Sequence, residues 1–277
     1  MPVLLALLSS LLWGGSDFLG GKATRRLPGV SVVGVSQAAA LLGLIPIAVL
    51  AGSRPDTLLA GVAAGLAGVI GLALFYTALA KGTMGVVAPI AALGTLIPVA
   101  VGLARGETPG ALQVGGIVLA ILGVVLASGP ELTGGASLTP LLLAAGSAVG
   151  FGLVAVLLAA GSEGEVGAVV VTLLVMRLTS VGALVALMLV VRRKVDTGVG
   201  RADLPMLVAI GAGDVAANAC FALASRGGLL SVVSVLGSLY PVVTILLARQ
   251  FLAERLRPVQ IAGVGGTLLG VALLAAG

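Results

Sequence analysis

The sequence predicts an all-α integral membrane protein whose ten transmembrane helices form two inverted repeats of five. Of its 277 residues, 59% are hydrophobic and only 9% are charged, and the mean hydropathy is +1.26. A soluble domain has about a quarter of its residues charged. Several apolar runs reach the roughly 20 residues that a helix needs to cross the hydrocarbon core, and none shows the short alternating segments of a membrane β-barrel. A further observation is a pattern of residues that occurs twice.

The first five predicted spans are separated by short polar or helix-breaking segments. They cover 3–21, 29–50, 58–80, 84–104 and 110–128. The segments that follow them read KATRRLP, AGSRPDT, KGT, RGETP and GPELTGGAS. Each contains charge, glycine or proline, which end an apolar helix. The first span starts close to Met1 with no basic segment before it, so we expect a retained helix rather than a cleaved signal peptide.

The second five predicted spans follow the same rule. They cover 138–160, 166–191, 204–225, 230–251 and 258–276. The segments between them read GSEGE, RRKVDTGVGRAD, RGGL and LAERLR. The longest connections, 129–138 and 192–203, are too short to hold a domain. Residues that carry the function are therefore expected among the helices.

The repeated pattern divides the chain into two halves, 1–128 and 138–277. LGTLIP at 93–98 and LGSLYP at 236–241 share leucine, glycine, leucine and proline at the same positions. Further landmarks then recur in order with the same internal spacing: Glu107, Gln113, Gly116 and Gly123 as Glu254, Gln260, Gly263 and Gly270. Because five is odd, the second half begins on the opposite side of the membrane. The halves are therefore expected to be inverted repeats, a construction typical of secondary transporters that work by alternating access.

These motifs resemble those of the drug/metabolite transporter superfamily, specifically its ten-span EamA-type permeases. The resemblance covers nearly the whole chain and rests on LLWGGSDFLGGK in the first span, the two hexapeptides, and the spaced glutamate, glutamine and glycines. Arg177 in span seven lies where such proteins often carry an arginine, whereas Gln37, at the corresponding position of span two, departs from that pattern.

The resemblance implies a carrier, more often an exporter, that moves small metabolites or drugs through a central cavity of the cell membrane. Such carriers are commonly driven by proton exchange or by the solute gradient. We expect the cavity near spans one, four, seven, eight and nine. The expected partners are a small-molecule solute, a coupled proton and membrane lipid, and the chain is expected to be a monomer or homodimer. No enzyme activity and no cofactor are expected.

Asp17 in the first predicted span is a candidate site residue. A carboxylate deep in the membrane costs about 2.5 to 3.5 kcal/mol on insertion scales unless it faces a cavity or a partner. Asp17 is therefore interpreted either as a proton-coupling or substrate-amine site, or as a residue near the end of its span that pairs with Lys22 or is hydrated at the membrane surface.

Asp214, Asn218 and Arg177 form a second candidate group. Asp214 and Asn218 are four residues apart, so they share one face of a helix. They would contact a solute or relay a proton, or else form a helix-helix contact with Ser180 or Arg177. Arg177 cannot lose its charge, and Asp214 is its natural partner. Together they would bind an anionic or zwitterionic solute, or would only join spans seven and eight.

Pro98 and Pro241 occupy equivalent places within the two halves. Each removes a backbone donor, which permits a kink, and they are predicted to be hinges beside the central site. The alternative is that proline is simply common in membrane helices. Tyr240 is a candidate cavity aromatic, whereas Trp13 and Tyr76 either line the cavity or anchor the protein at the membrane surface.

Other features are interpreted as structural. Glu107 and Glu254 each precede a predicted span, where a carboxylate complements the positive N-terminal end of a helix. Glycines of span three would allow close helix packing. The lone Cys220 excludes an internal disulfide, and the absence of histidine argues against a zinc or haem site, so no metal is expected. The net charge of +5 comes from scattered residues and only 3% of residues are aromatic, so a nucleic-acid surface is not expected.

The charge distribution and two rival functions leave questions open. Eleven basic residues fall in odd-numbered loops and three in even-numbered ones, which places both termini outside the cytoplasm by the positive-inside rule. Members of the family that the sequence resembles usually have both termini inside. GAGD at 211–214 fits the G-x-G-D pattern of intramembrane aspartyl proteases, with Asp17 as the second acid. A passive solute channel is the other alternative.

Overall fold

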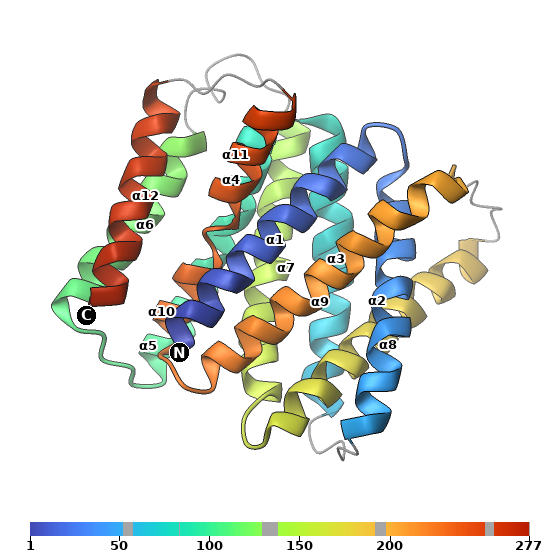
Figure 1. The fold of residues 1–277 in the computed structure, drawn as a ribbon, viewed down its shortest axis with the longest axis horizontal. Coiled ribbons are helices and arrows are strands. Elements are labelled where there is room, and N and C mark those ends of the chain that lie inside the picture. Colours follow the sequence, from blue (N-terminus) through green and yellow to red (C-terminus); the bar gives the residue numbers. More distant parts are fainter. Residues whose placement is uncertain (52–57, 83, 129–137, 192–197, 253–257, 277) are drawn as a thin grey trace.

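The computed structural model describes residues 1–51, 58–82, 84–128, 138–191, 198–252 and 258–276. These residues form helices joined by short turns, with no strand among them (Figure 1). The helices of the first half are α1 (Pro2–Thr24), α2 (Gly29–Ala51), α3 (Leu58–Lys81), α4 (Met84–Ala92), η1 (Leu93–Thr95), α5 (Leu96–Ala104) and α6 (Ala111–Ser128). Those of the second half are α7 (Leu138–Gly161), α8 (Val166–Val191), η3 (Arg201–Asp203), α9 (Leu204–Ser225), α10 (Leu230–Gly237), α11 (Tyr240–Leu252) and α12 (Pro258–Ala276).

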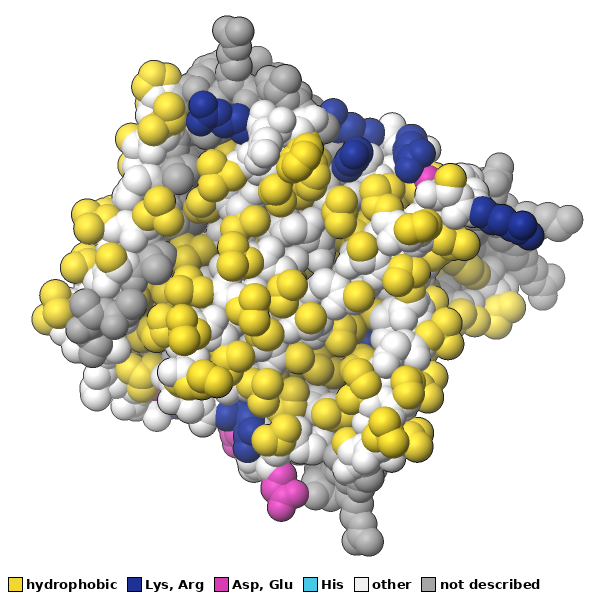
Figure 2. Space-filling view, viewed as in Figure 1, with side chains coloured by type: hydrophobic (Ala, Val, Ile, Leu, Met, Phe, Trp, Pro, Cys, Tyr) yellow, Lys and Arg dark blue, Asp and Glu magenta, His cyan; other side chains and the backbone are white. Residues whose placement is uncertain are grey.

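The described helices confirm a multi-span membrane protein. Eight helical segments among the described residues are long and apolar enough to cross a membrane. The remaining two predicted spans correspond to α6 and α12, whose apolar stretches, Ala111–Gly123 and Ile261–Leu274, are shorter. Large hydrophobic side chains on the outer faces of the helices are exposed, as expected of a surface that faces lipid (Figure 2).

Two of the predicted spans are broken in the middle. Span 84–104 consists of α4, the 3₁₀ turn η1 and α5, and span 230–251 consists of α10 and α11. Each break falls in the repeated hexapeptide. Pro98 and Pro241 lie in the first turn of the helix after the break, where a missing N–H is no loss because that group has no partner in the same helix. The prolines were expected to kink continuous helices, and the structure instead places them at helix starts.

Helices of the two halves are interleaved. The contacts of α3 with α7 and α8, of α9 with α1 and α2, and of α6 with α12 all join the first half to the second. Glycine allows these close approaches. A Cβ added at Gly65 in α3 would lie 2.5 Å from the carbonyl oxygen of Met176 in α8. One added at Gly211 in α9 would lie 2.2 Å from the carbonyl oxygen of Ser36 in α2. Small residues thus bring the helix backbones together, as is usual in membrane bundles.

The two termini lie on the same side of the molecule (Figure 1). Basic side chains gather mainly along the opposite edge, where α1 ends and α9 begins (Figure 2). These are the same basic residues that the loop counts include, so the orientation of the termini stays a prediction.

Candidate functional site

A cavity lies between the two broken helices and the long helices α1, α3, α7, α8 and α9. Its empty space, including the part that is open to the outside, is about 770 Å³. The lining is mainly apolar and contains three charged residues, Asp17, Arg177 and Asp214. An apolar cavity with a few polar groups is the usual form of a small-molecule site. The cavity was expected near spans one, four, seven, eight and nine. Residues of spans three and six, which form α3 and α7, also line it.

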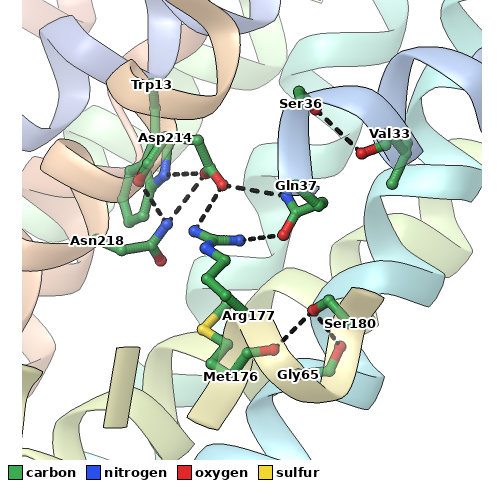
Figure 3. A network of polar contacts seen from close by, with 10 residues as sticks. All are labelled: Trp13, Val33, Ser36, Gln37, Gly65, Met176, Arg177, Ser180, Asp214 and Asn218. Carbon is green, nitrogen blue, oxygen red and sulfur yellow. Dashed lines mark hydrogen bonds and ion pairs between the residues drawn. The ribbon is translucent and has the colours of Figure 1, made fainter. Parts of the chain in front are cut away.

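The carboxylate of Asp214 is the centre of a network that joins four helices (Figure 3). Its Oδ2 is 2.7 Å from Nη2 of Arg177 in α8 and accepts a long hydrogen bond of 3.4 Å from Nε2 of Gln37 in α2. Its Oδ1 accepts hydrogen bonds from Nε1 of Trp13 in α1, at 3.2 Å, and from Nδ2 of Asn218, at 3.0 Å. Three hydrogen-bond donors and the guanidinium of Arg177 therefore surround this carboxylate.

Arg177 is almost completely buried, with 1% of its surface exposed. Besides the ion pair with Asp214, its Nη1 donates to Oε1 of Gln37 at 2.5 Å, while its Nε has no hydrogen-bond partner in the described part of the chain. A buried charge requires such partners because it has lost its hydration. Gln37, which departs from the family pattern, thus contacts both members of the ion pair.

One predicted partner is wrong. Ser180 was a candidate partner for Asp214 and Asn218, but its hydroxyl donates to the carbonyl oxygens of Met176 and Gly65. The hydroxyl of a serine in a helix often donates to the carbonyl four residues earlier, and Ser180 makes this bond with Met176. The spacing of Asp214 and Asn218 does bring the two side chains together on one face of α9.

Asp17 lies in α1, lines the cavity and is 7% exposed. The alternative that it pairs with Lys22 at the membrane surface is wrong, because Asp17 is buried and makes no ion pair or hydrogen bond with any other described residue. The two cavity carboxylates therefore differ: Asp214 is surrounded by donors, and Asp17 has none.

The three candidate aromatic residues have different surroundings. Trp13 and Tyr240 line the cavity, and the ring of Trp13 packs against Phe221 with the centroids 5.7 Å apart. The hydroxyl of Tyr240 is buried without a hydrogen-bond partner among the described residues. Tyr76 is 2% exposed, packs against Phe75 and is not part of the lining. The alternative of membrane-surface anchors is wrong for Trp13 and Tyr76.

Several lining residues were not predicted from the sequence. Thr95 and Ser238 stand at the same position of the two hexapeptides, and both line the cavity at the helix breaks. The repeat could have identified them, because both copies have a hydroxyl residue, threonine or serine, at this position. Phe151 in α7 also lines the cavity. No local signal marks it, since apolar residues surround it in the sequence.

Glu107 has a different structural role from the one expected. It was expected to complement the start of the span that follows it. Instead its Oε1 accepts from the backbone N–H of Leu230, at 2.6 Å, and its Oε2 from that of Ser231, at 3.0 Å. It therefore caps α10 in the other half of the chain. The start of α6 is capped by Gln113, whose Oε1 accepts from Gly110 N. Glu254 lies outside the described residues.

Among the described residues, no group of three or more histidine, cysteine, aspartate or glutamate side chains could hold a metal ion.

Comparison with known proteins identifies one matching family. The sequence pattern described as "EamA-like transporter family" matches residues 1–129 and again 138–276. No curated protein matches the chain significantly. Among 29 matching chains of solved structures, one described as "Crystal structure of protein" has a TM-score of 0.76 and 20% sequence identity, with 99% of this chain and 98% of that chain covered. At this identity the likeness shows the fold alone.

Proposed function

The chain belongs to the EamA-like transporter family, and we propose that it is a secondary carrier that moves small organic solutes across the cell membrane by alternating access. The observation that carries the proposal is the cavity between two helices that are broken at equivalent positions. Transporters commonly bind their solute where discontinuous helices meet near the bilayer midplane. Export is proposed as the net direction, on the resemblance of the sequence alone.

We propose that the two halves are inverted repeats around this cavity. If α1, α2 and α3 correspond to α7, α8 and α9, then the contact of α3 with α7 corresponds to that of α9 with α1. The contact of α3 with α8 likewise corresponds to that of α9 with α2. All four contacts are present. Such matched contacts support a two-fold relation, which would allow the same cavity to open to either side.

The ion pair of Arg177 and Asp214 is proposed to hold α8 and α9 together beside the cavity. Trp13 and Gln37 extend the same network to α1 and α2. Pro98 and Pro241 are proposed as hinges, because each follows a break at which the chain can bend without losing a helical hydrogen bond. The protease alternative is not favoured, because a protease dyad shares a proton between two carboxylates, whereas Asp214 is paired with an arginine.

Solute exchange in proteoliposomes tests this proposal. Thermal-shift screening against amino acids, nucleosides, sugars and cationic drugs would first identify a bound solute. For a carrier, uptake of the labelled solute saturates and is accelerated by unlabelled solute inside the vesicle. A passive channel would show neither effect, and cleavage of a test peptide would indicate a protease. Either result would overturn the proposal.

A further inference from the structure

The cavity contains one carboxylate that has no positively charged partner in the described part of the chain. Asp17, Asp214 and Arg177 are the charged residues in its lining. Arg177 is paired with Asp214 at 2.7 Å, so these two charges cancel, and Asp17 remains. The ionised cavity therefore has a net charge of −1.

Among the described residues, no positively charged group is paired with Asp17. The titratable groups that interact electrostatically with it from neighbouring helices are Asp214 from α9, Tyr76 from α3 and Tyr240 from α11. None of these carries a positive charge, and the guanidinium of Arg177 is engaged by Asp214 and Gln37. An ionised carboxylate that is buried without a partner is costly. It must either bind a proton or meet a cation that enters the cavity.

Aromatic side chains line the same cavity. Trp13, Tyr240 and Phe151 contribute to the lining. Aromatic faces attract organic cations, and the apolar remainder of the lining suits the hydrocarbon part of such a molecule.

We propose that the solute is an organic amine with an apolar body, and that Asp17 is the counter-ion for its cationic nitrogen. This rests on the proposed carrier function and names the class of solute. A proton competes for the same carboxylate. When the ammonium group binds to the protonated site, the carboxyl proton leaves to solvent and the amine keeps its own protons. Solute and proton therefore exclude each other, which couples their movements in opposite directions.

Calorimetry on the purified protein in detergent tests the recognition of charge. The probes are phenethylamine, 2-phenylethanol and phenylacetate, which share a phenyl group and differ in charge. We expect wild-type protein to bind the amine at least tenfold more tightly than the alcohol, and the acid most weakly. In Asp17→Asn the amine should bind no better than the alcohol, while affinity for the alcohol stays within twofold. Asp17→Glu should restore the preference for the amine, and Glu163→Gln, at an exposed carboxylate, should leave it unchanged.

Proton release provides a second measurement that needs only the unaltered protein. In weakly buffered solution, binding of the amine should release protons, and its affinity should fall as the pH is lowered. The proposal is overturned if the amine fails to bind or binds no better than the alcohol, if binding releases no proton, or if Asp17→Asn keeps the preference.

Exchange in proteoliposomes separates this proposal from the carrier function. Exchange of neutral or anionic solutes alone would overturn the assignment of Asp17 and leave the carrier function standing. Binding of the amine through Asp17 without any exchange would support the assignment of Asp17 and overturn the carrier function.

Discussion

Replacing Asp214 with asparagine should destabilise the protein more than removing its partner Arg177. In Asp214→Asn the guanidinium, 1% exposed, keeps the side-chain oxygen of Gln37 as its one other acceptor among the described residues, besides the new amide. In Arg177→Met the carboxylate keeps three donors, from Trp13, Gln37 and Asn218. Breaking a buried pair by removing one partner costs about 3 to 5 kcal/mol. We expect Asp214→Asn within that range and Arg177→Met below it.

The double variant Arg177→Met/Asp214→Asn separates the pair from its parts. Replacing both members of a buried ion pair is often close to neutral, so the double variant should be more stable than Asp214→Asn alone. Glu163→Gln is a matched control, because the ion pair of Glu163 with Arg105 is long, at 3.6 Å, and exposed. It should cost less than about 1 kcal/mol.

Reversible unfolding of the four variants in detergent measures these differences. The reasoning is refuted if Asp214→Asn costs less than Arg177→Met, or if the double variant is as unstable as the sum of the two single changes. Either result would mean that Arg177 does not depend on Asp214 for compensation of its buried charge.

Three further predictions concern the cap of α10, a close contact between helices, and the two prolines at the helix breaks. Glu107→Ala should lower stability by about 0.5 to 2 kcal/mol in thermal unfolding, because α10 loses the carboxylate that accepts from its first N–H groups; no loss would contradict the cap. Gly94→Ala places a Cβ 2.2 Å from a carbonyl oxygen of α7 and should cost about 1 to 3 kcal/mol, whereas Gly115→Ala, which meets nothing within 4 Å, should be neutral or stabilising in the same assay. Pro98→Ala and Pro241→Ala should slow solute exchange in proteoliposomes while the solute Kd changes less than twofold; unchanged exchange would remove their role as hinges.

Features that depend on local spacing were predictable from the sequence. The apolar runs located the helices, and the spacing of Asp214 and Asn218 placed both side chains on one face of α9. The repeated hexapeptide marked both points at which a helix is interrupted. The interruptions themselves were not predicted, because a proline in an apolar run is compatible with a kink or with a new helix start.

Features that depend on tertiary contacts were not predictable. Trp13 and Asp214 are 201 residues apart, and nothing in their sequence neighbourhoods shows that the indole donates to the carboxylate. Glu107 illustrates the same limit. A carboxylate favours the N-terminal end of some helix, but only the packing of the two halves places the start of α10 within its reach.

The interleaving of the two halves has a consequence for biosynthesis. The helices of the first half contact mainly helices of the second, so the first five spans are synthesised before most of the surfaces that they pack against. Until the second half is made, glycines such as Gly65 and Gly94 lack the backbones that they contact in the finished protein. The packing of α3 against α7 and of α1 against α9 can therefore form only after α7 and α9 have been synthesised. A chain cut between the halves would yield two fragments that become stable only when both are present in one membrane.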